Sequence, residues 1–329
     1  MQSAVKITAR AYWVAEPGRG EIRSEAIKAP AASEVLIQTR YSAISRGTEM
    51  LVFSGQVPPS EYDTMRAPFQ HGTFPGPLKY GYISVGTIVD GPEDRLGSTV
   101  FCLHPHQDRY VVPSHAAIDV PADVPPRLAV LAANMETAIN GLWDSGIGVG
   151  DHCVVVGAGL VGCLVAALAS RIPGVEVTLV DIDPSREEIA ASLGAHFAMP
   201  ADAVGDADLV IHTSGNPAGL VTSLGLAGFE ATILEMSWFG SRTANVPLGE
   251  AFHSKRLTLK SSQVGHVADG RRARWSHGRR LVKALDLLAD PIFDRLITHE
   301  SQFEDLPQTF EGLADGAERP LCHLINYDS

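Results

Sequence analysis

The stretch Val154-Val-Val-Gly-Ala-Gly-Leu-Val-Gly162 decides the fold. Its β-branched residues are typical of a buried strand, and the G-x-G-x-x-G pattern leads into an apolar stripe at helical spacing. The first glycine permits a tight turn, the second lets a phosphate approach the backbone, and the third lets helix and strand pack closely. The helix N-terminus would present free N–H groups and the positive end of its dipole. The pattern predicts a dinucleotide-binding turn with contacts at Gly157, Gly159, Leu160, Val161 and Gly162.

A carboxylate ends the next predicted strand, Val177–Asp181. The side chain of Asp181 would hydrogen-bond the adenosine ribose hydroxyls and repel a 2′-phosphate. NAD is therefore favoured over NADP as the cofactor. Asp183 competes for this role, and Arg186, a second candidate contact, would weaken the preference. The alternative is a Rossmann-like sheet whose cofactor site is unused.

Strand and helix patterns alternate around this loop, beginning with a helical segment over Leu128–Trp143. Such alternation is typical of βαβ units built on a parallel sheet. We therefore predict an α/β fold in which residues 129–266 form a Rossmann dinucleotide-binding domain, a doubly wound parallel sheet. The alternating segments are Cys153–Val156, Leu160–Arg171, Val175–Val180, Ser185–Leu193, Leu209–His212, Gly219–Leu226 and Ala231–Met236.

The residues before this region differ in composition and in hydrophobic pattern. It is rich in Val, Ile, Gly and Pro, and turn signals separate short apolar runs such as residues 35–39, 83–89 and 110–112. That pattern predicts a β-rich domain over residues 1–128. A helix is expected near residues 281–288 and a strand near residues 321–325. We expect residues 267–329 to return to the first domain.

Length and composition narrow the function classes. The 329 residues suit two domains, and 45% hydrophobic with 19% charged residues is ordinary for a folded protein. A net charge of −12 argues against a general affinity for nucleic acid or an anionic membrane. Residues 153–170 are uncharged, which meets the length of a membrane span, but three glycines divide the run into a strand and a helix.

The cysteines and the N-terminus indicate the compartment. No C-x-x-C pair occurs among the four cysteines, and MQSAVKITARAYWV at the start lacks an apolar signal-peptide core. Both features favour a cytoplasmic protein with reduced thiols. One local charge cluster stands out, at Arg271, Arg272, Arg274, Arg279 and Arg280. It is either a solvated loop and helix start or a landing site for an anionic substrate.

The glycine loop belongs to a longer set of motifs that resembles the medium-chain dehydrogenase/reductase superfamily, which includes the zinc alcohol dehydrogenases. The set continues with Val180-Asp-Ile-Asp183 and Ala191-Ser-Leu-Gly-Ala195. Upstream, Ser45-Arg-Gly-Thr-Glu49 resembles the C-G-T-D region of that family, and Leu296-Ile-Thr-His299 resembles its I-T-H segment. Within the superfamily, the chain is most similar to the branch containing 2-desacetyl-2-hydroxyethyl bacteriochlorophyllide a dehydrogenase.

The resemblance covers nearly the whole chain and implies a GroES-like β domain beside the Rossmann domain. It also implies a cleft between the domains with the nicotinamide at its base, and a homodimer formed through the cofactor domain. The branch suggests a small-molecule substrate that is large for its class and bears a carboxylate. Neither nucleic acid nor a membrane is expected as a partner.

The zinc ligands of the family are replaced in this chain. Arg46 aligns with the first cysteine, Tyr82 with the histidine, and Ala133 or Asn134 with the second cysteine. A guanidinium stays protonated and has no lone pair to offer a metal. The four-cysteine structural lobe is also missing, so neither catalytic nor structural zinc is expected. A competing metal hypothesis places Cys102, His104 and His106 on one face of a strand.

The catalytic candidates follow from the same alignment. Arg46 would stabilise a developing alkoxide or bind a substrate carboxylate, although an Arg46–Glu49 ion pair in a turn is an equal alternative. Thr48 falls where the family passes the alcohol proton, and Tyr82 would donate to a substrate oxygen. Glu136 would act as an acid or base, or else as a cap or salt-bridge partner.

Further residues are expected to line the cofactor cleft. Thr137 matches a family position near the nicotinamide, and the others follow successive Rossmann strands. They are Ser214, Gly215, Ser237 and Gln263.

Three hypotheses for function result. The first is a zinc-independent, NAD(H)-dependent oxidoreductase that moves hydride between nicotinamide and an alcohol/ketone or an activated alkene. The second is a zinc alcohol dehydrogenase with non-standard ligands. The third is a non-catalytic nucleotide-binding sensor or assembly protein.

Overall fold

The computed structural model describes residues 6–316 and 318–327, and the chain divides into two compact units. The first unit contains Met1–Ala133 and Leu285–Ser329, and the second contains Asn134–Ala284. The sequence placed the boundaries at 128/129 and 266/267 instead. The first five residues of the N-terminal stretch used to judge a signal peptide lie outside the described residues.

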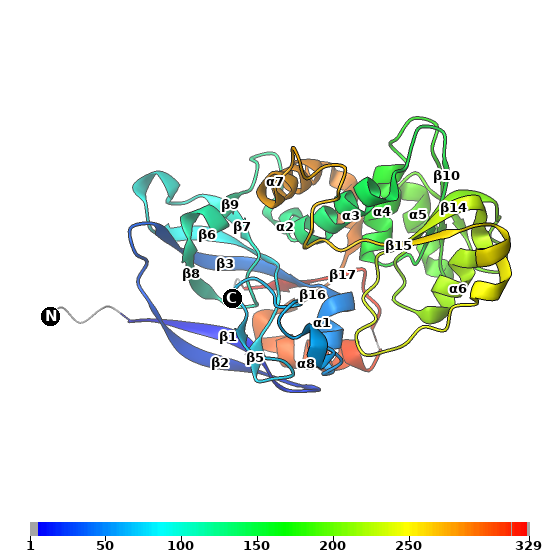
Figure 1. Ribbon diagram of the computed structural model, residues 1–329. Helices are drawn as coiled ribbons and strands as arrows, with labels where there is room; N and C mark the ends of the chain where they lie inside the picture. The colour runs from blue at the N-terminus through cyan, green and yellow to red at the C-terminus, as the bar shows by residue number, and fades with distance from the viewer. Residues whose placement is uncertain (1–5, 317, 328–329) are drawn as a thin grey trace. The chain divides into compact units, whose positions relative to one another are not determined.

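The second unit is built on a six-stranded sheet with the order β12-β11-β10-β13-β14-β15, and every neighbouring pair is parallel (Figure 1). The order reverses between β10 and β13. In doubly wound sheets ligands bind at such a switch point, outside the carboxyl ends of the strands. The strands are β10 (His152–Val156), β11 (Glu176–Val180), β12 (His196–Ala198), β13 (Ala207–His212), β14 (Ala227–Glu235) and β15 (Thr258–Ser261).

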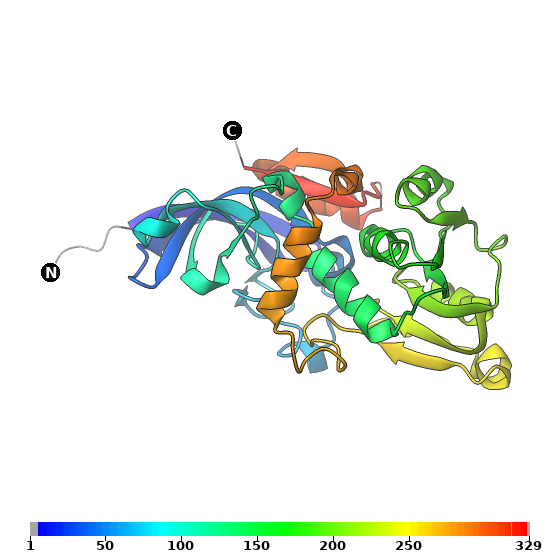
Figure 2. The same cartoon turned by 90° about the horizontal axis from the view of Figure 1, so that it is seen from above.

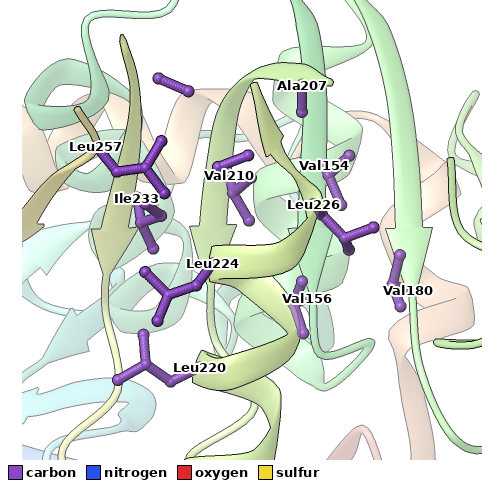
Figure 3. Packing of buried hydrophobic residues seen from close by; sticks show 12 residues of the cluster. Val154, Val156, Val180, Ala207, Val210, Leu220, Leu224, Leu226, Ile233 and Leu257 are labelled. Carbon is purple, nitrogen blue, oxygen red and sulfur yellow. The ribbon is translucent and has the colours of Figure 1, made fainter. Parts of the chain in front are cut away.

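Helices cover this sheet with apolar side chains. Leu220, Leu224 and Leu226 at α6 (Pro217–Leu226) point toward valines of the central strands, as Figure 3 shows. These strands are buried on both faces, which explains their continuous rather than alternating apolar pattern. The other helices that follow strands of this sheet are α4 (Leu160–Ala169) and α5 (Glu187–Ser192).

The predicted helix over residues 128–143 is divided. A turn at residues 130–131 separates α2 (Pro126–Ala129) from α3 (Ala132–Ser145). Helix α7 (His277–Leu287) runs beside α3 (Figures 1 and 2). Arg280 of α7 joins Glu136 of α3 by a buried ion pair, so the arginine-rich segment packs as part of the second unit.

The first unit contains two sheets. A four-stranded sheet has the order β2-β1-β5-β4, and a seven-stranded sheet has the order β16-β17-β3-β6-β7-β9 with β8 paired to β3. Buried Val, Ile and Tyr side chains of β3, β6, β7 and β8 form the core of the second of these. The strands are β1 (Lys6–Glu16), β2 (Arg19–Lys28), β3 (Glu34–Ile44), β4 (His71–Gly72), β5 (Leu78–Lys79), β6 (Ser84–Asp90), β7 (Thr99–Cys102), β8 (Arg109–Pro113), β9 (Ile118–Asp119), β16 (Ile297–Gln302) and β17 (Cys322–Asn326).

The C-terminal segment contributes both a strand and a helix to this unit. β17 pairs antiparallel with β3, and α8 (Leu306–Ala314) lies near α1 (Arg46–Phe53). Phe310 of α8 stacks on Tyr12 with ring centroids 4.5 Å apart and lies 5.5 Å from the ring of Phe53. Aromatic packing across this long sequence separation therefore anchors the returning chain.

Two expectations about local structure are settled by the backbone. The idea that Cys102, His104 and His106 share a strand face is wrong, because β7 ends at Cys102 and a tight turn follows, in which the His104 N–H donates to the Cys102 carbonyl. Residues 153–170 divide into β10 and α4. Within the described ranges, no helix has both the length and the apolar character that crossing a membrane requires.

Candidate functional site

The glycine loop forms a tight turn between β10 and α4. Gly157 has a φ of +111°, and a Cβ there would lie 2.6 Å from the Ser214 nitrogen. A Cβ on Gly162 would lie 1.9 Å from the Gly157 carbonyl oxygen, so helix and turn touch backbone to backbone. A Cβ on Gly159 would meet no atom within 4 Å. The second glycine thus faces open space beside the helix N-terminus, where an anionic pyrophosphate fits.

Leu160 and Val161 are the first residues of α4, and Gly159 is its N-cap. Glycine has no side chain to accept a hydrogen bond from the helix N–H groups, and the cap makes none. The first-turn N–H groups are therefore available to a ligand.

Asp181 lies just past the end of β11, beside this turn. One carboxylate oxygen accepts from the Ala158 N–H at 2.6 Å, and the other accepts from the Asp183 N–H at 2.9 Å. Asp183 caps the following turn through Ser185 and forms an ion pair with Arg186 at 3.2 Å. The carboxylate of Asp181 therefore shapes the glycine turn from the side on which the ribose is expected, and Arg186 is held by Asp183.

The loops after β13 and β14 are joined by a hydrogen-bond network. Fully buried His212 places Nδ1 2.7 Å from a Glu235 carboxylate oxygen and Nε2 2.7 Å from the Ser214 hydroxyl. The Ser237 N–H donates to Glu235 at 2.7 Å, and the Ser237 hydroxyl accepts from the Gly215 N–H at 3.0 Å. Three of the predicted cleft residues, Ser214, Gly215 and Ser237, are thus brought together at one end of the sheet.

Gln263 lies beyond this network, in the loop that follows β15. Its side-chain oxygen accepts from the Gly265 N–H at 2.7 Å, so it organises a local turn. Thr137 lies on α3 and is half-buried.

Glu136 is a buried residue of α3 in the second unit. Its carboxylate accepts from the Arg280 Nε at 2.9 Å, and Arg280 also donates to the Asn140 side-chain oxygen and the Val264 carbonyl. Burial raises the pKa of Glu136 above its usual range, and the Arg280 guanidinium opposes that shift. The arrangement found here is the salt bridge, which ties α7 and its preceding loop to α3.

Glu49 is the centre of a second buried cluster, in the first unit. It lies on α1 with 2% exposure, so the segment that begins at Arg46 is helical rather than a turn, and the Glu49 carboxylate is buried. One oxygen accepts from the Ser45 N–H at 2.8 Å, and the other lies 3.0 Å from His106 Nε2. His106 Nδ1 is 2.7 Å from the Ser42 hydroxyl, which also hydrogen-bonds Tyr327 at 3.0 Å.

Tyr82 and Thr48 adjoin this cluster. The Tyr82 hydroxyl donates to the Ser45 hydroxyl at 2.7 Å. Burial, reinforced by the Glu49 charge, raises the pKa of Tyr82 to about 12, and hydrogen bonding to Ser45 and Thr48 opposes the shift. Tyr82 is therefore a protonated donor at neutral pH. Arg46 begins α1 next to these groups and is partly exposed.

Comparisons with known proteins were made for both sequence and structure. No family model matches the sequence. The chain is 25% identical to D-guloside 3-dehydrogenase of Escherichia coli K12 in an alignment of 320 positions that covers 86% of this chain and 90% of that protein. An uncharacterized zinc-type alcohol dehydrogenase-like protein of Haemophilus influenzae is 29% identical over 64% of this chain, and the match spans only 61% of that protein. The 2-desacetyl-2-hydroxyethyl bacteriochlorophyllide A dehydrogenase of Cereibacter sphaeroides is 30% identical over 44% of this chain and 48% of its own length.

Solved structures agree in fold. L-idonate 5-dehydrogenase from E. coli superposes with a TM-score of 0.80 at 15% identity, covering 99% of this chain and 100% of that one. An alcohol dehydrogenase from E. coli CFT073 complexed with NADH has a TM-score of 0.74 at 18% identity, covering 97% and 99%. A structure described as a zinc-binding dehydrogenase from Sinorhizobium meliloti, bound to NADP, has a TM-score of 0.78 at 17% identity, covering 98% of this chain and 100% of that one.

The chain is related to the medium-chain dehydrogenases/reductases. Its homologues and structural neighbours are dehydrogenases of that superfamily, with the GroES-like and Rossmann units described above. These relatives support an oxidoreductase that uses a nicotinamide dinucleotide, and the glycine turn of this chain fits such a group.

The side chains of this chain that could bind a metal differ from the cysteine and histidine ligands of a zinc-type dehydrogenase. No group of three or more His, Cys, Asp or Glu side chains suited to a metal occurs in the described part of the chain. Glu49 and His106 satisfy each other, and burial raises the pKa of the Cys102 thiol to about 12, which disfavours a thiolate ligand. His104 stacks on Tyr110 with ring centroids 3.6 Å apart. The described residues therefore form no donor set of the kind that holds zinc in zinc-type dehydrogenases.

Sequence reasoning missed two buried polar pairs of the candidate site. His106 was considered only as a metal ligand, yet it is the buried partner of Glu49. The His212–Glu235 pair was also missed, although a signal was present: both residues end neighbouring parallel strands, and the register pairs them directly. A predicted strand order would have placed them side by side.

Proposed function

We propose that this protein is a zinc-independent, NAD(H)-dependent oxidoreductase that transfers hydride between the cofactor and the carbon of an alcohol/ketone or activated alkene. The observation that carries the proposal is the open backbone turn at Gly159, at the switch point of the parallel sheet. The cofactor supplies or accepts the hydride when it is bound. The residues of the chain then have to bind and orient the cofactor and the substrate, and to polarise the substrate oxygen.

Arg46, Thr48 and Tyr82 are proposed to polarise the substrate oxygen. Arg46 would contribute a fixed positive charge, which a carbonyl needs as it develops toward an alkoxide. Tyr82 and Thr48 would donate hydrogen bonds, and the high pKa of Tyr82 makes it a donor rather than a base at neutral pH. Glu49, held by Ser45 and His106, would keep the first turn of α1 in place beneath these groups.

NAD is proposed in preference to NADP because of Asp181. Its carboxylate is fixed by two backbone N–H groups next to the glycine turn, where a 2′-phosphate would meet a fixed negative charge. Arg186 is paired with Asp183, which weakens its ability to compensate.

A cofactor titration tests the proposal first. Purified protein is titrated with NADH and with NADPH while nicotinamide fluorescence is followed, and then Asp181→Ala is compared with wild type. We expect NADH to bind at least ten-fold more tightly, and the ratio to collapse in the variant. NADPH preference in wild type would overturn the NAD assignment. Binding of neither nucleotide would overturn the oxidoreductase itself.

The zinc-type names of some relatives favour one second candidate, a zinc dehydrogenase with non-standard ligands. Elemental analysis of protein purified without chelator separates the two. A stoichiometric zinc content that is lost together with activity on chelation would support the second candidate.

The remaining properties are proposals of the same kind. We propose a small-molecule substrate, with a carboxylate favoured by the similarity to the bacteriochlorophyllide dehydrogenase. We further propose a cytoplasmic homodimer with neither nucleic acid nor a membrane as partner.

A further inference from the structure

A small hollow in the second unit is lined mainly by arginine. It has a volume of about 200 Å³ and is formed by Gly270, Arg271, Arg274, Trp275 and Arg279, in the segment between β15 and α7. We call it the arginine hollow. The proposed dehydrogenase function assigns no role to the residues that line it.

The positive charge of the arginine hollow is not neutralised by any carboxylate in the described part of the chain. Two neighbouring arginines are paired, Arg272 with Asp269 at 3.3 Å and Arg280 with Glu136 at 2.9 Å. Across residues 6–316 and 318–327, Arg271, Arg274 and Arg279 have no carboxylate within ion-pair distance. In a chain with a net charge of −12, three uncompensated guanidinium groups around one hollow are a local reversal of sign.

Two tryptophans hold the guanidinium groups of Arg271 and Arg279 in place. Trp143 of α3 packs against Trp275 with ring centroids 4.8 Å apart. Arg271 lies over the Trp143 ring at 5.6 Å, and Arg279 lies over the Trp275 ring at 4.0 Å. Arg279 is further fixed by donating to the Arg274 carbonyl at 2.7 Å.

This stacking matters for binding because a guanidinium uses its face for an aromatic ring and its edge for hydrogen bonds. The N–H edges of stacked arginines remain available to oxyanions in the bidentate geometry that carboxylates and phosphates accept. Fixing the side chains beforehand also reduces the conformational entropy that binding would cost. Arg271 and Arg279 are therefore preorganised in the hollow, and Arg274 adds a third, exposed positive charge beside them.

We propose that the arginine hollow binds a small polyanion carrying two or more closely spaced oxyanion groups, either phosphates or carboxylates. A monoanion would neutralise only one of the three guanidinium charges, whereas a compact polyanion would neutralise all three. This site does not depend on the proposed dehydrogenase function, because binding can be measured with no nucleotide present.

Calorimetric titration with tripolyphosphate and with citrate, each at 0.15 M salt, tests the proposal. The two probes distinguish a phosphate-bearing from a carboxylate-bearing ligand, and binding of either supports the site. The Arg274→Gln/Arg279→Gln double variant should weaken the bound probe at least ten-fold. Arg272→Gln is the matched control, since it removes an exposed charge from the same loop outside the hollow, and it should change affinity less than two-fold.

The outcomes that would overturn the proposal are distinct. Binding of neither probe to wild type would do so, as would equal weakening by the control, which would indicate diffuse electrostatics. Binding that survives in the double variant and is competed by NADH would place the anion at the glycine turn instead. NADH affinity and the thermal midpoint of each variant show that it remains folded, and a failure to bind NADH in wild type would count against the oxidoreductase alone.

Discussion

Arg46 is the residue on which the proposed chemistry depends most. It stands at the start of α1, beside a carboxylate that is already held by Ser45 and His106. If its charge stabilises a developing alkoxide, Arg46→Ala should lower kcat about 100-fold, roughly 2.7 kcal/mol, while NADH affinity stays within two-fold. Steady-state kinetics on the first active substrate give the result, with Arg46→Lys as the charge-conserving control. Unchanged turnover in Arg46→Ala would remove Arg46 from the mechanism.

His104 makes stability depend on pH. It is buried with 6% exposure, and desolvation lowers its pKa from 6.5 to about 3. In the unfolded chain the imidazole takes up a proton below pH 6.5, but in the folded chain it does not, so folding stability falls as pH decreases below 6.5. Between pH 7 and pH 5 this residue should cost about 2 kcal/mol.

His104→Phe isolates this effect because it keeps a ring against Tyr110 but cannot titrate. Urea unfolding at pH 7 and pH 5 should show the loss of stability in wild type to be about 2 kcal/mol larger than in the variant. Equal losses in the two proteins would show that His104 is protonated in the folded state.

The start of α4 offers a matched pair of glycines at the scale of an element. Gly162→Ala would push a Cβ against the Gly157 carbonyl, so we expect destabilisation of about 1–3 kcal/mol, measured by urea unfolding. A Cβ on Gly159 would meet no atom within 4 Å, so Gly159→Ala should keep the stability while a side chain at this position lowers NADH affinity, and Gly159→Val should lower it at least ten-fold. NADH binding that tolerates Gly159→Val would show that the pyrophosphate lies elsewhere.

The helices and strands of the candidate site also differ in how far they could be predicted from the sequence. The glycine turn, its strand and its helix follow from local backbone demands, so the pattern over residues 154–162 was sufficient. The strand expected through His104 and His106 failed because a turn at Cys102 breaks it. Pro105 is a local signal for that break, and the His104 ring hydrogen-bonds the neighbouring Pro105 carbonyl. Only His106 is satisfied by distant partners, Ser42 and Glu49, which the sequence does not reveal.

At the scale of the whole molecule, the edge of the parallel sheet is the feature most open to association. β15 is an edge strand with exposed side chains, and Leu259 is 40% exposed. Exposed edges pair readily with a second chain. If the proposed homodimer forms there, Leu259→Glu should convert dimers to monomers in light scattering because it places like charges at the interface. A dimer that persists would place the interface elsewhere, and a wild-type monomer would refute the dimer.

Local backbone structure could be predicted from the sequence alone. Runs of β-branched residues, glycines at fixed spacing and the alternation of strand and helix specify each βαβ unit, because these are demands of the backbone within a few residues. The expectation that Arg46 and Tyr82 stand where zinc dehydrogenases carry metal ligands rests on the resemblance to that family and stays a prediction.

Only the tertiary structure decided which polar groups meet. Glu136 and Arg280 are 144 positions apart, and Glu49 and His106 are 57 apart, yet each pair is buried in contact. Burying a charge requires a partner of suitable geometry, and chain topology rather than spacing supplies it. For the same reason only the folded chain divides the five arginines of the cluster into buried Arg280, Arg272 paired with Asp269, and three that surround a hollow.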